Sequence, residues 1–165
     1  MNNNFDKKKS LEDLMRFLSI EGITGEEHDI AMNIKDDLIN SGVPPEYITF
    51  DNANDKIPLP TQVGNLIIKL PGTIDAERIM FSSHLDTVPL CKGAIPVIKG
   101  DKILPKDNTA LGGDNRTGVS ALVTMVKTLF KNNIPHVPIT ILFTVREESG
   151  LWGARMAKKE DLGNP

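Results

Sequence analysis

The stretch Phe81-Ser82-Ser83-His84-Leu85-Asp86-Thr87-Val88-Pro89 places an imidazole and a carboxylate two positions apart, where a predicted apolar strand ends. In an extended chain, residues i and i+2 lie on the same face, so both side chains can point into one site. A metal-ligating imidazole usually donates its second ring nitrogen to a carboxylate or carbonyl, which Asp86 could provide for His84. Taken alone, however, a His-x-Asp pair is more often a surface or turn histidine.

The composition is that of one ordinary globular domain. The 165 residues contain 39% apolar and 25% charged side chains, enough to bury a continuous core. The 22 acidic and 19 basic residues give a net charge of −3, which does not favour nucleic acid or an anionic membrane as partner. Cys91 is the only cysteine, which excludes an internal disulfide and suits a reducing cytoplasm. No apolar leader or membrane span is evident, so we expect a soluble, cytoplasmic protein.

Apolar periodicity predicts alternating helices and strands. Helices are expected from a capping box at Ser10 and over residues 26–40, and a longer one opens near Gly113. A small surface hairpin is expected from residues 96–98 and 102–104. Four β-prone runs predict strands, at residues 47–50, 63–70, 78–82 and 138–145.

These elements predict a single α/β domain of three layers, α/β/α, with a mostly parallel central sheet. The sheet should use residues 63–70, 78–82 and 138–145, with helices covering both of its faces. The run at 138–145 is almost entirely apolar, as expected for a strand that is buried on both faces.

Further acidic residues lie at the boundaries of these elements. Asp114 stands at the start of the long helix, where it is either an N-cap or, because of the flanking glycines, free to project into a site. Glu147 and Glu148 follow the buried strand, where adjacent carboxylates repel each other unless a cation or proton compensates, although a surface turn would tolerate them. Because α/β sheets bind ligands beyond the carboxyl ends of their strands, we expect these residues to converge with His84.

Three segments carry a recognisable resemblance. Residues 84–89 (HLDTVP), 112–118 (GGDNRTG) and 147–154 (EESGLWGA), in this order, resemble the metal-site motifs of the co-catalytic zinc aminopeptidases and deacylases of the peptidase T type. Between Cys91 and Gly113 the chain is most similar to the peptidase T-like, or tripeptide aminopeptidase-like, branch. The resemblance extends from about Leu11 to the last residue, and it implies a zinc-peptidase-like catalytic domain.

The resemblance implies a role for each candidate residue. His84 would bind one metal ion, Asp114 would bridge two, and Glu148 would bind the second. Glu147 would be the general base, and Asp86 would orient His84. The implied cofactor is a pair of zinc ions, with cobalt or manganese as alternatives, and the implied substrate is a short peptide that loses its N-terminal residue.

The resemblance also implies parts that this sequence does not contain. Members of the family carry a further carboxylate ligand beyond the Glu-Glu pair, a histidine near the end of the chain, and a dimerising lid domain between them. We therefore expect residues 1–165 to be the N-terminal part of a metallopeptidase catalytic domain, with the lid and the C-terminal part absent. The full-length protein should be a homodimer through its lid. Catalytic zinc usually has three protein ligands, and each ion would keep only two here, so the chain alone should be inactive or nearly so.

Three functions stay open at this point. The first is a metallopeptidase, or its N-terminal portion, that acts on short peptides. The second is a deacylase or amidase of the same family that acts on a small N-acyl substrate. The third is a non-catalytic fragment that keeps the fold without turnover.

Overall fold

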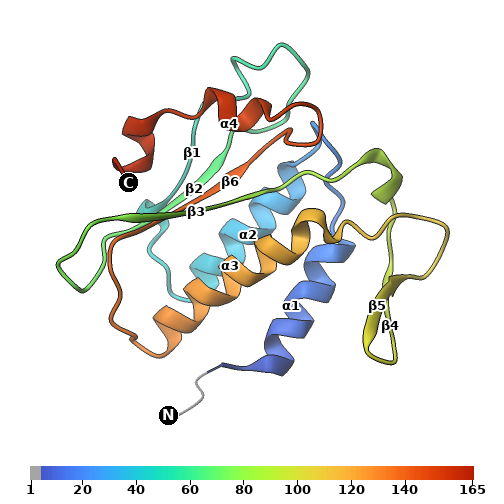
Figure 1. Cartoon of the computed structure of the whole chain (residues 1–165), viewed down its shortest axis with the longest axis horizontal. Coiled ribbons are helices and arrows are strands. Elements are labelled where there is room, and N and C mark those ends of the chain that lie inside the picture. The colour runs from blue at the N-terminus through green and yellow to red at the C-terminus, as the bar shows by residue number, and fades with distance from the viewer. Residues whose placement is uncertain (1–4) are drawn as a thin grey trace.

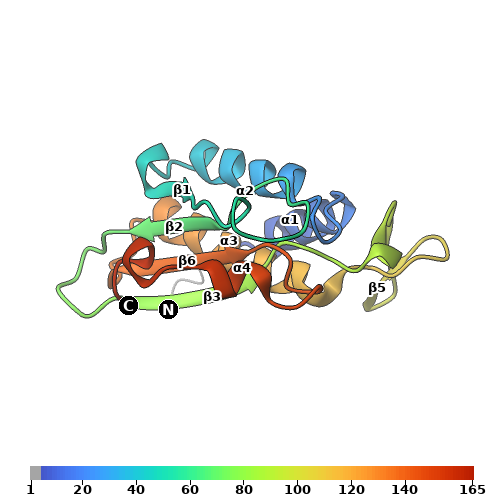
Figure 2. The same ribbon diagram turned by 90° about the horizontal axis from the view of Figure 1, so that it is seen from above.

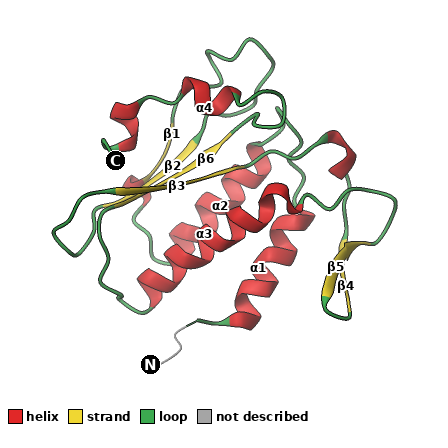
Figure 3. Cartoon of the chain, viewed as in Figure 1, coloured by secondary structure: helices red, strands yellow, loops and turns green. Residues whose placement is uncertain are grey.

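The computed structural model describes residues 5–165 (Figure 1). The α-helices within these residues are α1 (Lys7–Ser19), α2 (His28–Asn40), α3 (Gly113–Lys131) and α4 (Trp152–Met156). The strands are β1 (Ile48–Phe50), β2 (Leu66–Leu70), β3 (Ile79–His84), β4 (Pro96–Lys99), β5 (Lys102–Pro105) and β6 (Ile139–Thr144) (Figure 3). In the described part of the chain, no helix has both the length and the apolar character that crossing a membrane requires.

The predicted elements are present, with small shifts at their ends. The first helix begins at Lys7, and its N-cap is Asp6, whose carboxylate accepts the amide of Lys9, so the expected capping box at Ser10 is wrong. The second helix and the surface hairpin lie close to where the sequence predicted them. The β4–β5 hairpin projects from the body of the molecule (Figure 1).

The central sheet has four strands in the order β1-β2-β6-β3. The expected α/β domain with a central sheet is confirmed, but the expectation of a mostly parallel sheet is wrong. Only β3 and β6 pair in parallel, whereas β1 with β2 and β2 with β6 are antiparallel. Two successive strands can run parallel only if a crossover of a dozen or more residues, usually a helix, joins them. The segment 71–78 between β2 and β3 is shorter than this and contains no helix, so β2 and β3 run in opposite directions.

Helices cover the two faces of this sheet unequally. In Figure 1, α1, α2 and α3 lie below the sheet and the short α4 lies above it, and Figure 2 looks down on the α4 side. The main core lies under the three long helices, where β6 is buried at all six of its positions. On the α4 side, Ile67 and Leu142 pack with Leu162 in a much smaller cluster. The three-layer arrangement is therefore present, with a thin second helical layer.

The strand β3 forms one edge of the sheet. Its residues Ile79, Met80 and Phe81 are 43%, 42% and 37% exposed, so the expectation that helices cover this strand on both faces is not met. Its last two residues, Ser83 and His84, are buried. The strand thus presents an open edge along most of its length and is enclosed only where it reaches His84.

A charged cluster joins the three long helices. The Nζ atom of Lys127 on α3 lies 2.7 Å from Oδ2 of Asp13 on α1 and 3.0 Å from Oδ2 of Asp37 on α2. Burial by itself raises the pKa of Asp13, but the hydrogen bonds and charges of Lys127 and Lys9 outweigh burial and hold this pKa below its ordinary value. The cluster fixes α3, whose first turn carries Asp114, against the rest of the domain.

We predict that Asp13→Asn lowers the free energy of unfolding at pH 7 by about 1–3 kcal/mol, because Lys127 loses its buried charged partner. The pKa of Asp13 is lowered on folding, so its stabilisation is present above the unfolded value of 3.8 and is lost as pH falls through the folded pKa. Urea unfolding of wild type and variant between pH 7 and pH 2 measures both effects. The exposed Glu12→Gln is the control and should change stability by less than about 0.5 kcal/mol. Equal stability of wild type and Asp13→Asn at pH 7 would contradict this account.

Candidate metal centre

The parallel pairing of β3 with β6 sets the position of the candidate site. His84, the last residue of β3, pairs with Thr144, the last residue of β6. The two strands therefore end side by side, and the residues that follow them lie together beyond the carboxyl ends of the strands. This arrangement brings the His84–Asp86 pair next to Glu147 and Glu148, as the sequence predicted.

Asp114 reaches the same place from the start of α3. Its backbone is extended rather than helical (φ −88°, ψ 106°), and the N-cap of α3 is Gly112, so Asp114 is not the cap. The peptide bond that follows Asp114 is cis. Gly112 has a positive φ of 76°, and a Cβ atom there would lie 3.0 Å from Cγ2 of Thr87. The glycine thus allows the close approach that lets Asp114 project toward His84.

Three residues form a cluster with the dimensions of a metal site. His84, Asp114 and Glu148 each offer one ligand atom, and these atoms lie within 4.8 Å of one another. The Nε2 atom of His84 is 3.1 Å from Oδ1 of Asp114 and 3.9 Å from Oε2 of Glu147. Two atoms that bind one zinc ion at about 2.0–2.2 Å each lie at most about 4.4 Å apart, and the distance of 3.1 Å between His84 and Asp114 is within this limit. An imidazole with two carboxylates at this spacing is a donor set that suits zinc or a related divalent ion.

The two nitrogens of His84 face different partners. Nδ1 lies 3.0 Å from the backbone carbonyl oxygen of Asp86 and 3.5 Å from its carboxylate Oδ1. The carbonyl is thus the nearer acceptor, whereas the sequence pointed to the carboxylate of the same residue. With Nδ1 facing Asp86, Nε2 is left to face Oδ1 of Asp114 at 3.1 Å.

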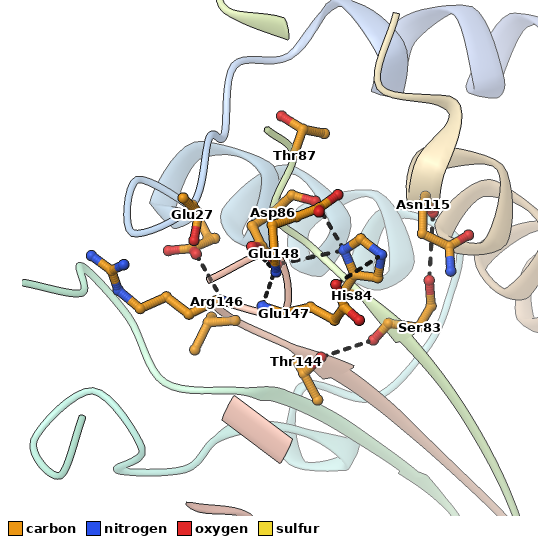
Figure 4. A network of polar contacts seen from close by, with 12 residues as sticks. Glu27, Ser83, His84, Asp86, Thr87, Asn115, Thr144, Arg146, Glu147 and Glu148 are labelled. Atoms are coloured by element: carbon orange, nitrogen blue, oxygen red, sulfur yellow. Dashed lines mark hydrogen bonds and ion pairs between the residues drawn. The ribbon is translucent and has the colours of Figure 1, made fainter. Parts of the chain in front are cut away.

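The carboxylate of Asp86 has a further role that the sequence did not indicate. It is fully buried, and it accepts the amide of Glu147 on Oδ1 at 2.9 Å and the amide of Glu148 on Oδ2 at 3.0 Å (Figure 4). Burial raises the pKa of Asp86, but His84 and these two amides outweigh burial and lower this pKa below its usual value. Asp86 therefore stays ionised and holds the loop that carries both glutamates.

The pKa shifts record crowded negative charge around His84. Burial disfavours the imidazolium, but the hydrogen bonds that His84 donates to Asp86 and Asp114, with the charge of Asp86, outweigh burial and raise the pKa of His84 to about 9. Burial, together with the charges of Asp114, Asp86 and Glu147, raises the pKa of Glu148, against an opposing effect of His84. This agrees with the expected repulsion between carboxylates here. A divalent cation would replace the proton as the compensating charge.

Three other buried polar residues were missed from the sequence: Glu27, Asn65 and Arg116. The first lies inside the helix that was predicted over residues 26–40, and no role for its side chain was predicted. No local pattern marks the second. Arg116 was noted only as part of the 112–118 motif. Their contacts come from parts of the chain that are distant in sequence, which no local pattern reports.

Comparison with known proteins identifies the family. Residues 65–163 match the model of Peptidase family M28. The chain belongs to this family. The expected resemblance to peptidase T-like enzymes is also confirmed, because the chain superposes on a tripeptidase from Staphylococcus aureus with a TM-score of 0.86 and 29% identity, over 96% of this chain and 41% of that one.

Two further proteins are similar to this chain over most of its length. The aminopeptidase PepT from Bacillus cereus gives a TM-score of 0.86 at 30% identity, over 96% of this chain and 42% of that one. An uncharacterised Bacillus subtilis protein, YqjE, is 34% identical over 151 residues, which are 91% of this chain and 39% of the relative. The chain thus spans about two fifths of the length of these relatives.

We predict that His84 titrates with a pKa of about 9 in the absence of divalent metal, and that Asp86→Asn lowers this pKa toward the ordinary value of 6.5. Because folding raises the pKa, the stabilisation from His84 is fully present below 6.5 and is lost as pH rises through about 9. NMR of the imidazole in a chelating buffer measures the titration. Asp36→Asn, on the exposed side of α2, is the control and should leave it unchanged. A pKa near 6.5 in the wild-type chain would contradict the geometry described here.

Proposed function

We propose that the protein to which this chain belongs is a metal-dependent exopeptidase that uses two zinc ions and releases N-terminal residues from short peptides. The observation that carries this proposal is the convergence of His84, Asp114 and Glu148, with Glu147 beside them, in a chain of a peptidase family. The tripeptidase from S. aureus and the aminopeptidase PepT from B. cereus, which share this fold at 29% and 30% identity, support the choice of substrate.

The donor set fits the proposed metal. His84 would bind through Nε2, Asp114 and Glu148 would bind through carboxylate oxygens, and Asp114 would be shared by both ions. When bound, such ions supply Lewis-acid activation of water and of the scissile carbonyl. The exposed carboxylate of Asp114, whose side chain is 85% accessible, would leave the centre open to substrate on that side.

Glu147 is the proposed general base. Its Oε2 lies 3.9 Å from Nε2 of His84, so its carboxylate borders the ligand cluster without belonging to the compact group of three. From there it could accept a proton from the attacking water and deliver it to the leaving amine. The bond from its amide to Asp86 fixes the backbone from which it projects.

The number of ligands limits what the 165-residue chain can do by itself. Three side chains shared between two ions give each ion fewer than the three protein ligands that catalytic zinc usually has. We therefore propose that this chain binds zinc weakly and turns over poorly. A cytoplasmic location, dimerisation through a lid domain and the deacylase alternative stay predictions.

We predict that zinc shifts the NMR signals of the His84 ring and that Asp114→Asn weakens this binding by at least about tenfold, because it changes a proposed ligand. A zinc titration of the 165-residue chain at pH 7.5 gives the affinity. Asp107→Asn, in an exposed loop, removes the same charge and should leave the affinity unchanged. Zinc that perturbs His28 or His136 but not His84 would contradict the proposed site.

We predict that Glu147→Gln lowers any metal-dependent turnover of unblocked tripeptides by about 10²–10⁴-fold, because it removes the general base while the three proposed ligands remain. Mass spectrometry of products with added zinc or cobalt measures turnover, and the zinc titration shows that the metal is retained. The same peptides with an acetylated N-terminus test the deacylase alternative. Turnover that the substitution leaves unchanged would remove Glu147 from its proposed role.

A further inference from the structure

The loop that follows β6 is held in an unusual way. The amides of Val145, Arg146, Glu147 and Glu148 all donate to side-chain oxygens, at 3.1, 3.1, 2.9 and 3.0 Å. The strand ladder of β6 ends at Thr144, so these amides have no strand to pair with, and a buried amide without an acceptor is costly. The acceptors, in the same order, are Asn65, Glu27, Asp86 and Asp86 again, all of them fully buried.

Glu27 is the acceptor for the amide of Arg146. It occupies the N-cap position of α2, but its side chain makes no capping bond to that helix. Instead its Oε1 accepts the amide of Gly25 at 2.7 Å and the amide of Arg146 at 3.1 Å, so it joins the start of α2 to the loop (Figure 4). Its carboxylate makes no other hydrogen bond within the described residues, and Oε2 is buried without a partner.

Arg146 is the residue at which the loop turns. Its φ of 50° lies in the left-handed region, which a non-glycine residue adopts only when its surroundings hold it there. Its guanidinium donates to Oγ1 of Thr61 at 2.8 Å, to the carbonyl of Pro60, and to Oγ of Ser149 at 3.3 Å. Both the backbone and the side chain of Arg146 are therefore anchored, and the direction of the next two residues follows from this turn.

We propose that Glu27 is a positioning residue, whose carboxylate oxygen holds the turn at Arg146 and thereby presents Glu147 and Glu148 to the metal centre. The part of this role that concerns metal rests on the proposed function, whereas the part that concerns the loop does not. Outer partners of metal ligands commonly change metal affinity although they touch no metal. Glu27 would act one step further out, through the backbone alone.

The acceptor oxygen, and not the negative charge, carries this role. A single oxygen, Oε1, accepts both amides, so the two bonds require an acceptor atom at this position. Glu27→Gln keeps that oxygen and removes the charge. Glu27→Asp keeps the charge, but its side chain is one methylene shorter and cannot reach both amides. Glu27→Ala removes the acceptor altogether.

The first measurement is amide hydrogen exchange by NMR on the 165-residue chain in a chelating buffer. Glu27→Ala should speed exchange at Arg146, Glu147 and Glu148 at least about tenfold, the change expected when a buried hydrogen bond is lost. Glu27→Asp should do the same to a smaller degree, and it replaces the alanine variant if that variant does not fold. Glu27→Gln should leave these three rates close to those of the wild type.

The second measurement is the zinc titration at the His84 ring. Glu27→Ala should weaken zinc binding by about 10–100-fold, and Glu27→Gln should restore it. The matched control is Thr140→Val, which removes a buried hydroxyl that bonds the carbonyl of Leu162 at 2.8 Å, at the opposite end of β6. Thermal unfolding of each variant shows how far it is destabilised, and the control should lose stability without losing affinity for zinc.

Three results would overturn the proposal. They are unchanged exchange at residues 146–148 in Glu27→Ala, a glutamine variant as damaged as the alanine variant, and a Thr140→Val variant that loses as much zinc affinity as Glu27→Ala does. If the wild-type chain binds no zinc at His84, the proposed metal site fails instead, and the exchange rates alone decide whether Glu27 positions the loop.

Discussion

The carboxylate of Asp86 connects the two halves of the candidate site. Asp86 lies two residues after His84, which is the last residue of β3. Its carboxylate accepts two successive amides from the loop that follows β6. These bonds form because β3 and β6 are parallel neighbours that end in register, so that each strand delivers its next residues to the same place. A residue that only oriented an imidazole could be exchanged at moderate cost. Asp86 also fixes the backbone of both glutamates, so its loss would disturb the proposed metal ligand, the proposed general base and their loop together.

The negative charges of Glu27, Asp86, Asp114, Glu147 and Glu148 lie close together and require compensating positive charge. Arg116 is almost fully buried and lies near Asp86 and Glu27. Burial lowers the pKa of Arg116 to about 10, although the charges of Asp86, Cys91 and Glu27 oppose this shift. Arg116 therefore remains charged at neutral pH. Backbone amides supply the rest of the compensation for the two buried carboxylates. The charges of Glu27 and Asp86 are thus compensated by the protein itself. The charges of Asp114, Glu147 and Glu148 are left for a cation to compensate.

The sequence predicted those features that depend on local pattern. Apolar periodicity located the strands and helices, and the burial of β6 on both faces followed from its composition. The convergence of His84, Asp114 and Glu148 was predicted because each residue stands at the end of a strand or the start of a helix. The direction of the strands was predicted wrongly for β2, since a buried strand has the same composition in either orientation. The role of Glu27 was also missed, because the bond from Arg146 to Glu27 joins residues 119 positions apart and leaves no periodic trace.

The pairing of β3 with β6 also has a consequence for how the chain folds. Residues that meet across this pair, such as Ser82 and Leu142, are 60 positions apart, and the whole of α3 lies between them. Closing so long a loop costs entropy before any contact repays it, and parallel pairing of this kind is intrinsically slow. Helices α1, α2 and α3 can form from local contacts well before that. The ligand cluster should therefore assemble late on the folding pathway, and a metal ion would meet it only after the sheet has closed.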